Sequence, residues 1–473
     1  MEEKRILPLK PFNSNCIKFI LAFPDYYEYG LPNLAIQVLY RKLYKIRDVL
    51  PDRYYLYTDD SKEKDKILEY KIPLKEADIV GFSIPYEGVI LNFIKILDIC
   101  GIPYKASQRQ ENDPIIVCGG PVVNCNPLPI APFGDIFILG EGEELIKDLV
   151  NLYKNHKKNG YFNKKNFLNC VSQLRGCYVP AVHGFHGYGL IKQTKPIDIN
   201  QFPSHSIFIS KNTIYGEETF SIELRRGCNQ RCRFCYMGTR LRPARTLKES
   251  TFKDLVDIGL RYSRIIKLFY EGLDPEYVEQ CLEYIRGKGG KVRIGSQRLD
   301  KLSERIIKII GEAGQRKLTV APETTERLRG VIGKQKIRNK DILKIVEISS
   351  NCGIPDFGLY FIIGLPFETI RDIDEIADFI MEVREKMNSL GNINGYLEIG
   401  LNMLYPKPWT PFQYACTILP NEAEGRLQYL ISKLSKGGYK VVVSTDVVDE
   451  KVERKKESVY KNLIKIETTI GTL

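Results

Sequence analysis

The sequence has little histidine and no long apolar run. Four histidines occur among its 473 residues, and the first of them is His156. No segment approaches the roughly 20 consecutive apolar residues that a membrane-spanning helix needs. Residues 1–15 lack the apolar stretch of a secretory signal. We therefore expect a cytoplasmic protein that does not contact a membrane.

Cysteine is too sparse to build a disulfide framework. The chain has twelve cysteines, and most of them stand alone in apolar stretches, where a buried thiol acts as a small hydrophobic side chain. One group is closely spaced, and it consists of Cys228, Cys232 and Cys235. In a reducing compartment these thiols are predicted to bind metal.

The positive charge of the chain is not concentrated in one region. The net charge is +12, but lysine and arginine are spread along the whole sequence. A nucleic-acid-binding protein gathers them in a patch or stripe. We therefore interpret the excess as a solvated basic surface and expect no nucleic-acid partner.

The pattern of residues 1–150 predicts a doubly wound parallel α/β domain. Short β-branched runs alternate with helical stretches. Ligands of such sheets bind outside the carboxyl ends of the strands. The loops expected at that edge are residues 24–30, 83–88, 119–121 and 140–143.

The remaining sequence divides into three further parts. Residues 151–215 are predicted to form a connecting subdomain, residues 216–415 a parallel barrel or partial barrel of six strand-helix units, and residues 416–473 a small α/β extension. All four histidines, His156, His183, His186 and His205, lie in the connecting part. We interpret them as structural or solvated, with a metal role for His183 and His186 as the alternative.

The three closely spaced cysteines predict an iron-sulfur cluster. Cys228, Cys232 and Cys235 follow a predicted strand with the spacing C-x3-C-x2-C. Three thiolates on one loop can hold three irons of a four-iron four-sulfur cluster and leave the fourth iron open. A closed zinc site would need a fourth ligand nearby. None of the histidines falls in the barrel, and the next cysteine is Cys281.

This motif, with an aromatic residue just before its third cysteine, resembles that of the radical S-adenosylmethionine (SAM) superfamily. The resemblance implies that the open iron binds SAM and that one electron cleaves it to a 5′-deoxyadenosyl radical. The family's SAM contacts carry over to Phe234, Tyr236, Glu271, Gly272, Glu323, Gly364 and Leu365. The Glu271 segment departs from the family pattern, in which two adjacent glycines precede the acid.

Two further stretches, residues 321–329 and 404–413, look like segments of radical SAM proteins that carry an N-terminal cobalamin-binding domain. The resemblance implies a Rossmann-like cobalamin-binding domain followed by a radical SAM partial (β/α)6 barrel and the α/β extension. The implied cobalamin contacts are Tyr26, Tyr27, Tyr29, Gly30, Ser83, Tyr86, Glu87, Gly119, Gly120, Gly140, Glu141 and Gly142.

One departure concerns the cobalt ligand. Cobalamin modules of the mutase type supply a histidine, but residues 1–155 contain none. Radical SAM relatives commonly bind cobalamin without that ligand. Tyr26, Tyr27 or Tyr29 could approach cobalt, water could do so, or these aromatic rings could merely line the pocket.

The resemblance implies a cobalamin-dependent radical SAM C-methyltransferase that acts on an unactivated carbon of a peptide or protein. The sequence is most similar to the methanogen enzymes that methylate a glutamine in the alpha subunit of methyl-coenzyme M reductase. The implied partners are that substrate and an external electron donor such as ferredoxin or flavodoxin.

Three alternatives stay open. A methylthiotransferase-like tRNA-modifying enzyme would need a second cluster on three N-terminal cysteines, yet Cys16, Cys100, Cys118 and Cys125 lie on separate predicted elements. An enzyme could use cobalamin without transferring methyl. A protein that only senses cobalamin or SAM would not cleave SAM.

Overall fold

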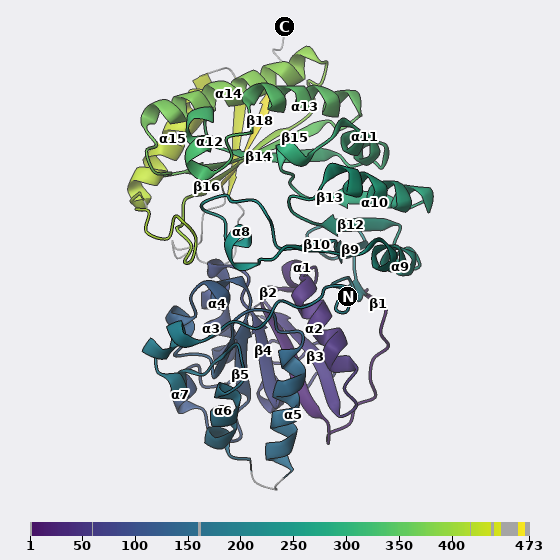
Figure 1. Cartoon of the computed structure of the whole chain (residues 1–473), viewed down its shortest axis with the longest axis vertical. Coiled ribbons are helices and arrows are strands. Elements are labelled where there is room, and N and C mark those ends of the chain that lie inside the picture. Colours follow the sequence, from purple (N-terminus) through teal and green to yellow (C-terminus); the bar gives the residue numbers. More distant parts are fainter. Residues whose placement is uncertain are drawn as a thin grey trace. The chain divides into compact units, whose positions relative to one another are not determined.

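A computed structural model describes residues 2–58, 60–158, 162–416, 418–436, 439–445 and 462–468 (Figure 1). The chain forms two compact units. Unit 1 comprises Met1–Glu223 and Asp257–Arg264, and unit 2 comprises Leu224–Val256 and Ile265–Leu473. The boundaries of the four domains expected from the sequence stay predictions.

Unit 1 is built on a six-stranded sheet with the order β3-β2-β4-β5-β6-β7. The first five strands are parallel, and β7 runs antiparallel to β6. The strand order reverses direction between β2 and β4, which makes this the switch point of a doubly wound sheet. The strands are β2 (Ile17–Tyr26), β3 (Val49–Leu56), β4 (Ile79–Ser83), β5 (Ile115–Gly119), β6 (Ile136–Ile138) and β7 (Cys177–Tyr178).

Helices cover both faces of this sheet because its strands are apolar on both sides. In β2, Phe19 and Leu21 belong to one buried cluster, whereas Ile20 and Ala22 belong to the other. Successive side chains of a strand point to opposite faces. One face packs on α2 (Leu34–Tyr44), α5 (Leu145–Lys157) and α6 (Lys164–Ser172), and the other on α3 (Ile90–Ile99) and α4 (Pro121–Cys125). Two shorter helices are α1 (Tyr27–Gly30) and α7 (Pro180–His183).

A buried arginine fixes the first residues of the chain to β3. Arg53 is fully buried, and its guanidinium lies 2.8 Å from carboxylate oxygens of both Glu3 and Glu69. It also lies 3.5 Å from the ring centroid of Phe208. Next to Glu3, strand β1 (Lys4–Arg5) pairs antiparallel with β8 (Phe208–Ile209). The ion pairs and the strand pair together hold three distant parts of unit 1 in one place.

Unit 2 contains five parallel strands. β12 (Ile265–Phe269) pairs with β13 (Lys291–Ile294), and β14 (Lys317–Glu323), β15 (Asp356–Ile363) and β16 (Leu397–Met403) pair in that order. A parallel bridge between Gln297 and Val320 links the two groups. These are five of the six strands of the predicted partial barrel, and the remaining predicted strand, β9 (Thr219–Glu223), falls in unit 1. The α/β fold class is therefore confirmed.

Helices alternate with the barrel strands, and the extension follows them. The helices are α9 (Glu249–Gly259), α10 (Pro275–Gly287), α11 (Glu304–Glu312), α12 (Glu326–Ile332), α13 (Asn339–Asn351), α14 (Ile370–Ser389) and α15 (Pro420–Lys436). After α15, β17 (Tyr439–Thr445) and β18 (Asn462–Thr468) pair antiparallel with each other, and β18 also pairs antiparallel with β16.

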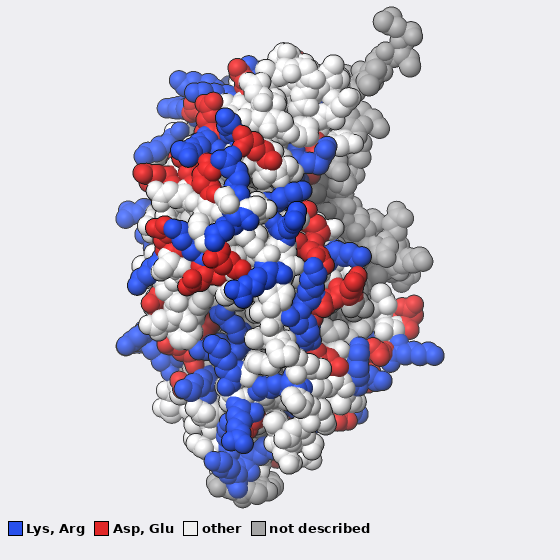
Figure 2. Space-filling model, turned by 90° about the vertical axis from the view of Figure 1, so that its right-hand side faces the viewer, with Lys and Arg blue, Asp and Glu red and all other residues white. Residues whose placement is uncertain are grey.

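The surface charge and the helices agree with the absence of apolar spans in the sequence. Figure 2 shows lysine and arginine interspersed with aspartate and glutamate over most of one face. Several of these charges pair along a helix or between helices, as Arg286 does with Glu283 and with Glu312. None of the described helices combines the length and the apolar composition that crossing a bilayer requires.

The histidines with described side chains make structural contacts. His156 Nδ1 lies 2.9 Å from the carbonyl oxygen of Leu152, and His183 Nδ1 accepts a hydrogen bond from the Val179 N–H at 3.0 Å. His205 is buried, and its ring stacks on Phe220. The side chain of His186, named above as a metal alternative with His183, lies outside the described residues.

We expect Arg53→Met to destabilise unit 1 by at least about 3 kcal/mol, because it leaves the Glu3 and Glu69 carboxylates without their buried partner. Hydrogen exchange of β2 and β3 peptides would report the opening free energy. The control is Arg47→Met, which removes an exposed arginine that follows α2. Equal protection in Arg53→Met and in the unchanged protein would contradict this role.

Acid should destabilise unit 1 through His205. Burial first, and the Arg41 guanidinium second, lower the pKa of His205 to about 3. The unfolded histidine takes up a proton near pH 6.5, whereas the folded one does not, so stability falls as the pH drops below about 6.5. The expected slope from this group is about 1.4 kcal/mol per pH unit. Urea unfolding between about pH 5 and pH 7 would measure it, and His205→Gln should remove it. An unchanged slope in that variant would refute the assignment.

Candidate functional site

The three closely spaced cysteines lie on a loop whose two ends require glycine. The loop runs from β10 (Arg225–Arg226), which pairs antiparallel with β11 (Arg245–Thr246), to α8 (Met237–Arg240). Gly227 has φ +79°, and a Cβ there would lie 1.9 Å from the carbonyl oxygen of Leu241. A Cβ on Gly238 would lie 2.4 Å from the carbonyl oxygen of Gln230. These close approaches fold the loop back on itself.

Each of the three sulfur atoms receives an N–H donor. The Gln230 N–H donates to Cys228 Sγ at 3.4 Å, and the Arg298 guanidinium donates to Cys232 Sγ at 3.3 Å. The backbone N–H groups of Met237 and Gly238 donate to Cys235. Hydrogen bonds of this kind stabilise thiolates and the sulfurs of iron-sulfur clusters.

The three thiols do not form the ligand set of a single metal ion. Across the residues that the structure describes, no three His, Cys, Asp or Glu side chains converge as the ligands of one metal ion. A four-iron cluster binds each thiolate through a different iron, so its ligands need not converge on one point. Cys228 and Cys232 are buried, and Cys235 is half-buried. Burial raises the pKa of Cys232, and the positive charges of Lys334 and Arg298 oppose that rise.

The predicted SAM residue Gly272 lies directly against the cysteine loop. It has φ +60°, and a Cβ there would lie 3.3 Å from Cys228 Sγ and 3.3 Å from Gln230 Cγ. Its carbonyl oxygen accepts a hydrogen bond from Arg225 at 3.2 Å. Burial raises the pKa of the neighbouring Glu271 to about 7, against the opposing charges of Lys334 and Arg298. The Glu271-Gly272 turn after β12 therefore belongs to the same site as the thiols.

Glu323 lies at the end of β14 and is fixed by a buried lysine. Its backbone has φ +68°, an uncommon conformation for a residue with a side chain. Its carboxylate accepts a hydrogen bond from Lys334 Nζ at 2.7 Å. The same ammonium group donates to the carbonyl oxygen of Ala321 at 2.9 Å and lies 5.9 Å from the ring centroid of Phe234. Lys334 thus links two predicted SAM contacts.

The other predicted SAM contacts extend this surface. Leu365 packs in an apolar cluster with Ile362, Leu404 and Phe412, and Phe234 lies against that cluster. Gly364 directly follows β15 and has φ +84°. Tyr236 is half-buried just before α8. The structure therefore gathers the thiols, both acids, the apolar residues and the two glycines in unit 2.

Sequence reasoning missed Arg298 and Lys334. Arg298 stands just after β13, at the carboxyl end of a barrel strand, where functional side chains concentrate, so its position was a usable signal. Lys334 follows α12, and no local pattern indicates its contact with Glu323.

In unit 1, the end of β2 and the loop after β4 meet at the switch point of the sheet. The Tyr86 hydroxyl donates a hydrogen bond to Asp25 Oδ2 at 2.8 Å, and Asp25 is buried. The side chains of Tyr29, Tyr86 and Glu87 are exposed. Tyr29 and Glu87 lie close in sequence to the two residues of this hydrogen bond. A ligand that approached this edge would meet these three side chains first.

The remaining predicted cobalamin residues hold the loops together. The Tyr27 hydroxyl donates to Glu3 at 2.9 Å, and a Cβ on Gly30 would lie 2.5 Å from the Tyr55 ring. Tyr26 is half-buried and packs against the core of one sheet face. Gly120 has φ +109°, and a Cβ there would lie 2.8 Å from the Ile84 carbonyl oxygen. Gly119 and Ser83 are partners in the sheet register.

The end of β6 is covered by a later part of the chain. Thr194 Oγ1 accepts a hydrogen bond from the Glu141 N–H at 2.6 Å, and the Glu141 carboxylate accepts one from the Ile197 N–H at 2.8 Å. A Cβ on Gly140 would lie 2.2 Å from Thr194 Oγ1. The carbonyl oxygen of Gly142 accepts a hydrogen bond from a backbone N–H in the first turn of α5. Glu141 therefore anchors residues 194–197.

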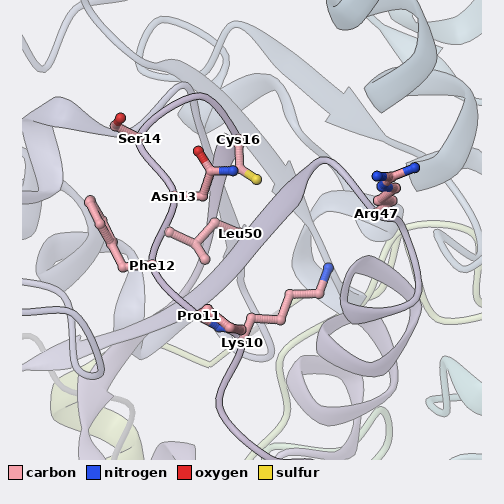
Figure 3. A pocket seen from close by; sticks show the side chains of 8 residues that line it. All are labelled: Lys10, Pro11, Phe12, Asn13, Ser14, Cys16, Arg47 and Leu50. Carbon is pink, nitrogen blue, oxygen red and sulfur yellow. The ribbon is translucent and has the colours of Figure 1, made fainter.

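A cavity of about 590 Å³ lies at the opposite, amino-terminal edge of this sheet (Figure 3). It is lined by Lys10, Pro11, Phe12, Asn13, Ser14, Cys16, Arg47 and Leu50. The Lys10 ammonium donates to the carbonyl oxygens of Ile46 at 2.7 Å and Val49 at 2.9 Å. The ammonium group therefore satisfies two backbone carbonyl groups between the end of α2 and the start of β3. None of the predicted site residues lines this cavity.

Two protein families match this chain in successive segments. Residues 35–180 match the model of the N-terminal region of radical SAM proteins, and residues 222–380 match the model of the radical SAM superfamily. An uncharacterized protein of Methanocaldococcus jannaschii is 27% identical over 427 residues, which cover 89% of this chain and 84% of the relative. The ribosomal protein uS12 methylthiotransferase RimO of Thermodesulfovibrio yellowstonii is 27% identical over 216 residues, or 42% of this chain and 50% of the relative.

Solved structures share the fold of the chain. The cobalamin-dependent radical enzyme OxsB, with aqua-cobalamin and SAM bound, aligns with a TM-score of 0.58 and 15% identity over 96% of this chain. The chain spans 64% of that OxsB structure and 52% of a second one. The methyltransferase TsrM of Kitasatospora setae, with cobalamin and a [4Fe-4S] cluster bound, aligns with a TM-score of 0.56 and 14% identity over 96% of this chain and 84% of its own.

The match over residues 222–380 covers the loop on which three thiols receive N–H donors and the first strands of the partial barrel that surround it. This segment therefore resembles the radical SAM superfamily both in sequence and in its three-thiol loop.

Proposed function

We propose that the chain is a cobalamin-dependent radical SAM methyltransferase that methylates an unactivated carbon of a peptide or protein. The observation that carries this proposal is the exposure of Tyr29, Tyr86 and Glu87 just after β2 and β4, in a chain that also has the three-thiol loop. The fold shared with OxsB and TsrM, both of which bind cobalamin, supports it. When bound, the cluster supplies the electron that cleaves SAM, and cobalamin supplies the methyl group.

The residues of unit 2 would hold and orient SAM. Cys228, Cys232 and Cys235 would hold three irons, and the Glu271-Gly272 turn, which lies beside Cys228, would contact SAM. The apolar surface of Phe234 and Leu365 would pack against the adenine and exclude water. Positioning of this kind is the main contribution of the protein in cofactor chemistry.

Unit 1 would bind cobalamin at the edge where Tyr29, Tyr86 and Glu87 are exposed. Residues 1–155 contain no histidine, so an imidazole from this segment does not reach cobalt. Among the three tyrosines predicted to approach cobalt, Tyr27 is bonded to Glu3 and Tyr29 is exposed. We therefore favour Tyr29 or water over Tyr27 at that position.

The substrate remains the most specific part of the proposal. The resemblance described above favours a glutamine in the alpha subunit of methyl-coenzyme M reductase, with ferredoxin or flavodoxin as electron donor. The test is to incubate the reconstituted enzyme with SAM, a reductant and a peptide that spans the glutamine. Tandem mass spectrometry should find one added methyl group on that residue. An unmodified peptide would refute this substrate while leaving SAM cleavage to be scored separately.

The methylthiotransferase alternative has one observation in its favour, the partial match to RimO. Such an enzyme would need a second cluster on cysteines of unit 1. Cys100 and Cys118 pack in the core of one sheet face and Cys177 in that of the other, while Cys16 lines the cavity at the amino-terminal edge. We therefore rank this function second.

A buried ion pair connects the extension to the predicted adenine contacts. The Gly364 N–H donates to Glu368 Oε1 at 2.9 Å, and the fully buried Glu368 carboxylate pairs with Arg426 of α15. Burial raises the pKa of Glu368, and the hydrogen bonds from Gly364 and Arg426 oppose that rise. Helix α15 thereby fixes the turn that follows β15.

Arg426→Met should weaken SAM binding about tenfold, because it leaves Glu368 buried without its partner and releases the Gly364 turn. Isothermal titration of the anaerobically reconstituted protein would measure the dissociation constant. The control is Lys433→Met, which removes a cation of the same helix that pairs with Asp374. Equal affinity in the two variants would show that the pair does not position the turn.

Cys232→Ala should abolish 5′-deoxyadenosine formation from SAM under reducing conditions, since two thiolates cannot hold the cluster that the radical chemistry needs. Chromatography of the reaction would measure the product, and circular dichroism should show a folded protein. The matched control is Cys352→Ala, which removes a half-buried thiol of unit 2 after α13. Product formation by Cys232→Ala would mean that the cluster ligands are wrongly assigned.

A further inference from the structure

The Arg298 guanidinium is the charged donor among the N–H groups that contact the three sulfurs. Its NH1 lies 3.3 Å from Cys232 Sγ, whereas Cys228 and Cys235 receive backbone N–H groups. The Arg298 side chain is 10% exposed and Cys232 is 8% exposed. A charge in such a shielded place acts more strongly than one in water.

Arg298 takes part in an ion pair, and the backbone next to it is hydrogen-bonded. Its Nε lies 2.6 Å from Asp300 Oδ1. The preceding residue, Gln297, donates its backbone N–H to the Thr319 carbonyl oxygen at 2.9 Å, so the backbone is tied to β14. A one-turn 3-10 helix, Leu299–Lys301, follows. The guanidinium therefore loses little conformational entropy when it contacts sulfur.

The ammonium group of the nearby Lys334 donates hydrogen bonds to oxygen atoms, whereas Arg298 donates one to sulfur. Lys334 Nζ pairs with Glu323 at 2.7 Å and with the Ala321 carbonyl oxygen at 2.9 Å. Its charge also lowers the pKa of Cys232, against the opposing charge of Glu323, but its ammonium group donates to these oxygen atoms. The Asp300 side chain is 21% exposed, so water screens its negative charge more than it screens Arg298.

From this geometry we propose that Arg298 is a positioning residue that donates a hydrogen bond to the Cys232 thiolate and raises the reduction potential of the cluster. The inference rests on the proposed cluster. Reduction adds one electron, and thus one negative charge, to the iron-sulfur unit, and the electron comes from the external donor. A positive hydrogen-bond donor at a sulfur ligand stabilises the more negative state. Asp300 opposes this effect while it orients the guanidinium.

The test is a redox titration of the anaerobically reconstituted full chain without SAM, followed by electron paramagnetic resonance. Arg298→Gln should lower the equilibrium constant for reduction about tenfold, which is a shift of about 59 mV to more negative potential for one electron. Arg298→Lys keeps the charge and should shift the potential less. Asp300→Asn removes the opposing charge and should shift the potential in the positive direction. A merely structural role would not produce shifts of opposite sign.

Iron analysis separates the two levels of the inference. Absence of iron from the unchanged protein would refute the cluster itself. Full iron content with equal potentials in Arg298→Gln, Asp300→Asn and the unchanged protein would overturn the role of Arg298. The role would also be overturned if Arg298→Gln changed the dissociation constant of SAM but not the potential, because the guanidinium would then serve the SAM carboxylate. If Arg298→Gln fails to assemble the cluster, the sign of the Asp300→Asn shift decides.

Discussion

Parallel strands end on the same edge of a sheet, and both units of this chain depend on that constraint. Each candidate site is assembled from segments that are far apart in sequence but follow neighbouring strands. In unit 1 these are the end of β2 and the loop after β4, which the hydrogen bond from Tyr86 to Asp25 joins. In unit 2 the Glu271-Gly272 turn follows β12, Arg298 follows β13, Glu323 ends β14 and Gly364 follows β15. The fold thus gathers these residues without any local sequence pattern that joins them.

Burying anionic sulfur is the main electrostatic cost of the site in unit 2. Burial raises the pKa of the Cys232 and Cys235 thiols, which disfavours the thiolates that bind iron. The chain offsets this cost with backbone N–H donors and with the positive charges of Arg298 and Lys334. The same cations act on Glu271, so the thiols and the acid of the predicted SAM site share one electrostatic environment. A substitution of Arg298 or Lys334 should therefore change the pKa of both Cys232 and Glu271.

Sequence patterns could predict the parts of this molecule that depend on local order. The C-x3-C-x2-C spacing indicates the cluster loop, and the apolar runs indicate the strands whose carboxyl ends carry the sites. The family match and the α/β fold agree with those predictions. The roles of individual cobalamin and SAM contacts stay predictions, although the structure places the SAM candidates together in unit 2.

Contacts between distant residues could not be predicted in this way. Tyr27 stood among the tyrosines expected near cobalt, but its hydroxyl is bonded to Glu3, a residue of the irregular start of the chain. Glu141 was expected to contact cobalamin, yet it anchors residues 194–197. Lys334 reaches Glu323 from a position just after α12, and Arg426 reaches Glu368 from within α15, and neither position carries a motif. In each case, tertiary packing determines which residue the side chain contacts, and the spacing of residues in the sequence does not indicate it.

The central claim is that one chain holds both a four-iron cluster and cobalamin. The most direct measurement is to reconstitute the full chain anaerobically with iron, sulfide and hydroxocobalamin, remove unbound cofactor, and determine bound iron and cobalamin by metal analysis and visible absorption. The account predicts about four irons per chain, as expected for this cluster type, and cobalamin at the level of the protein. Iron without cobalamin would contradict the methyl-transfer function and favour the sulfur-inserting alternative.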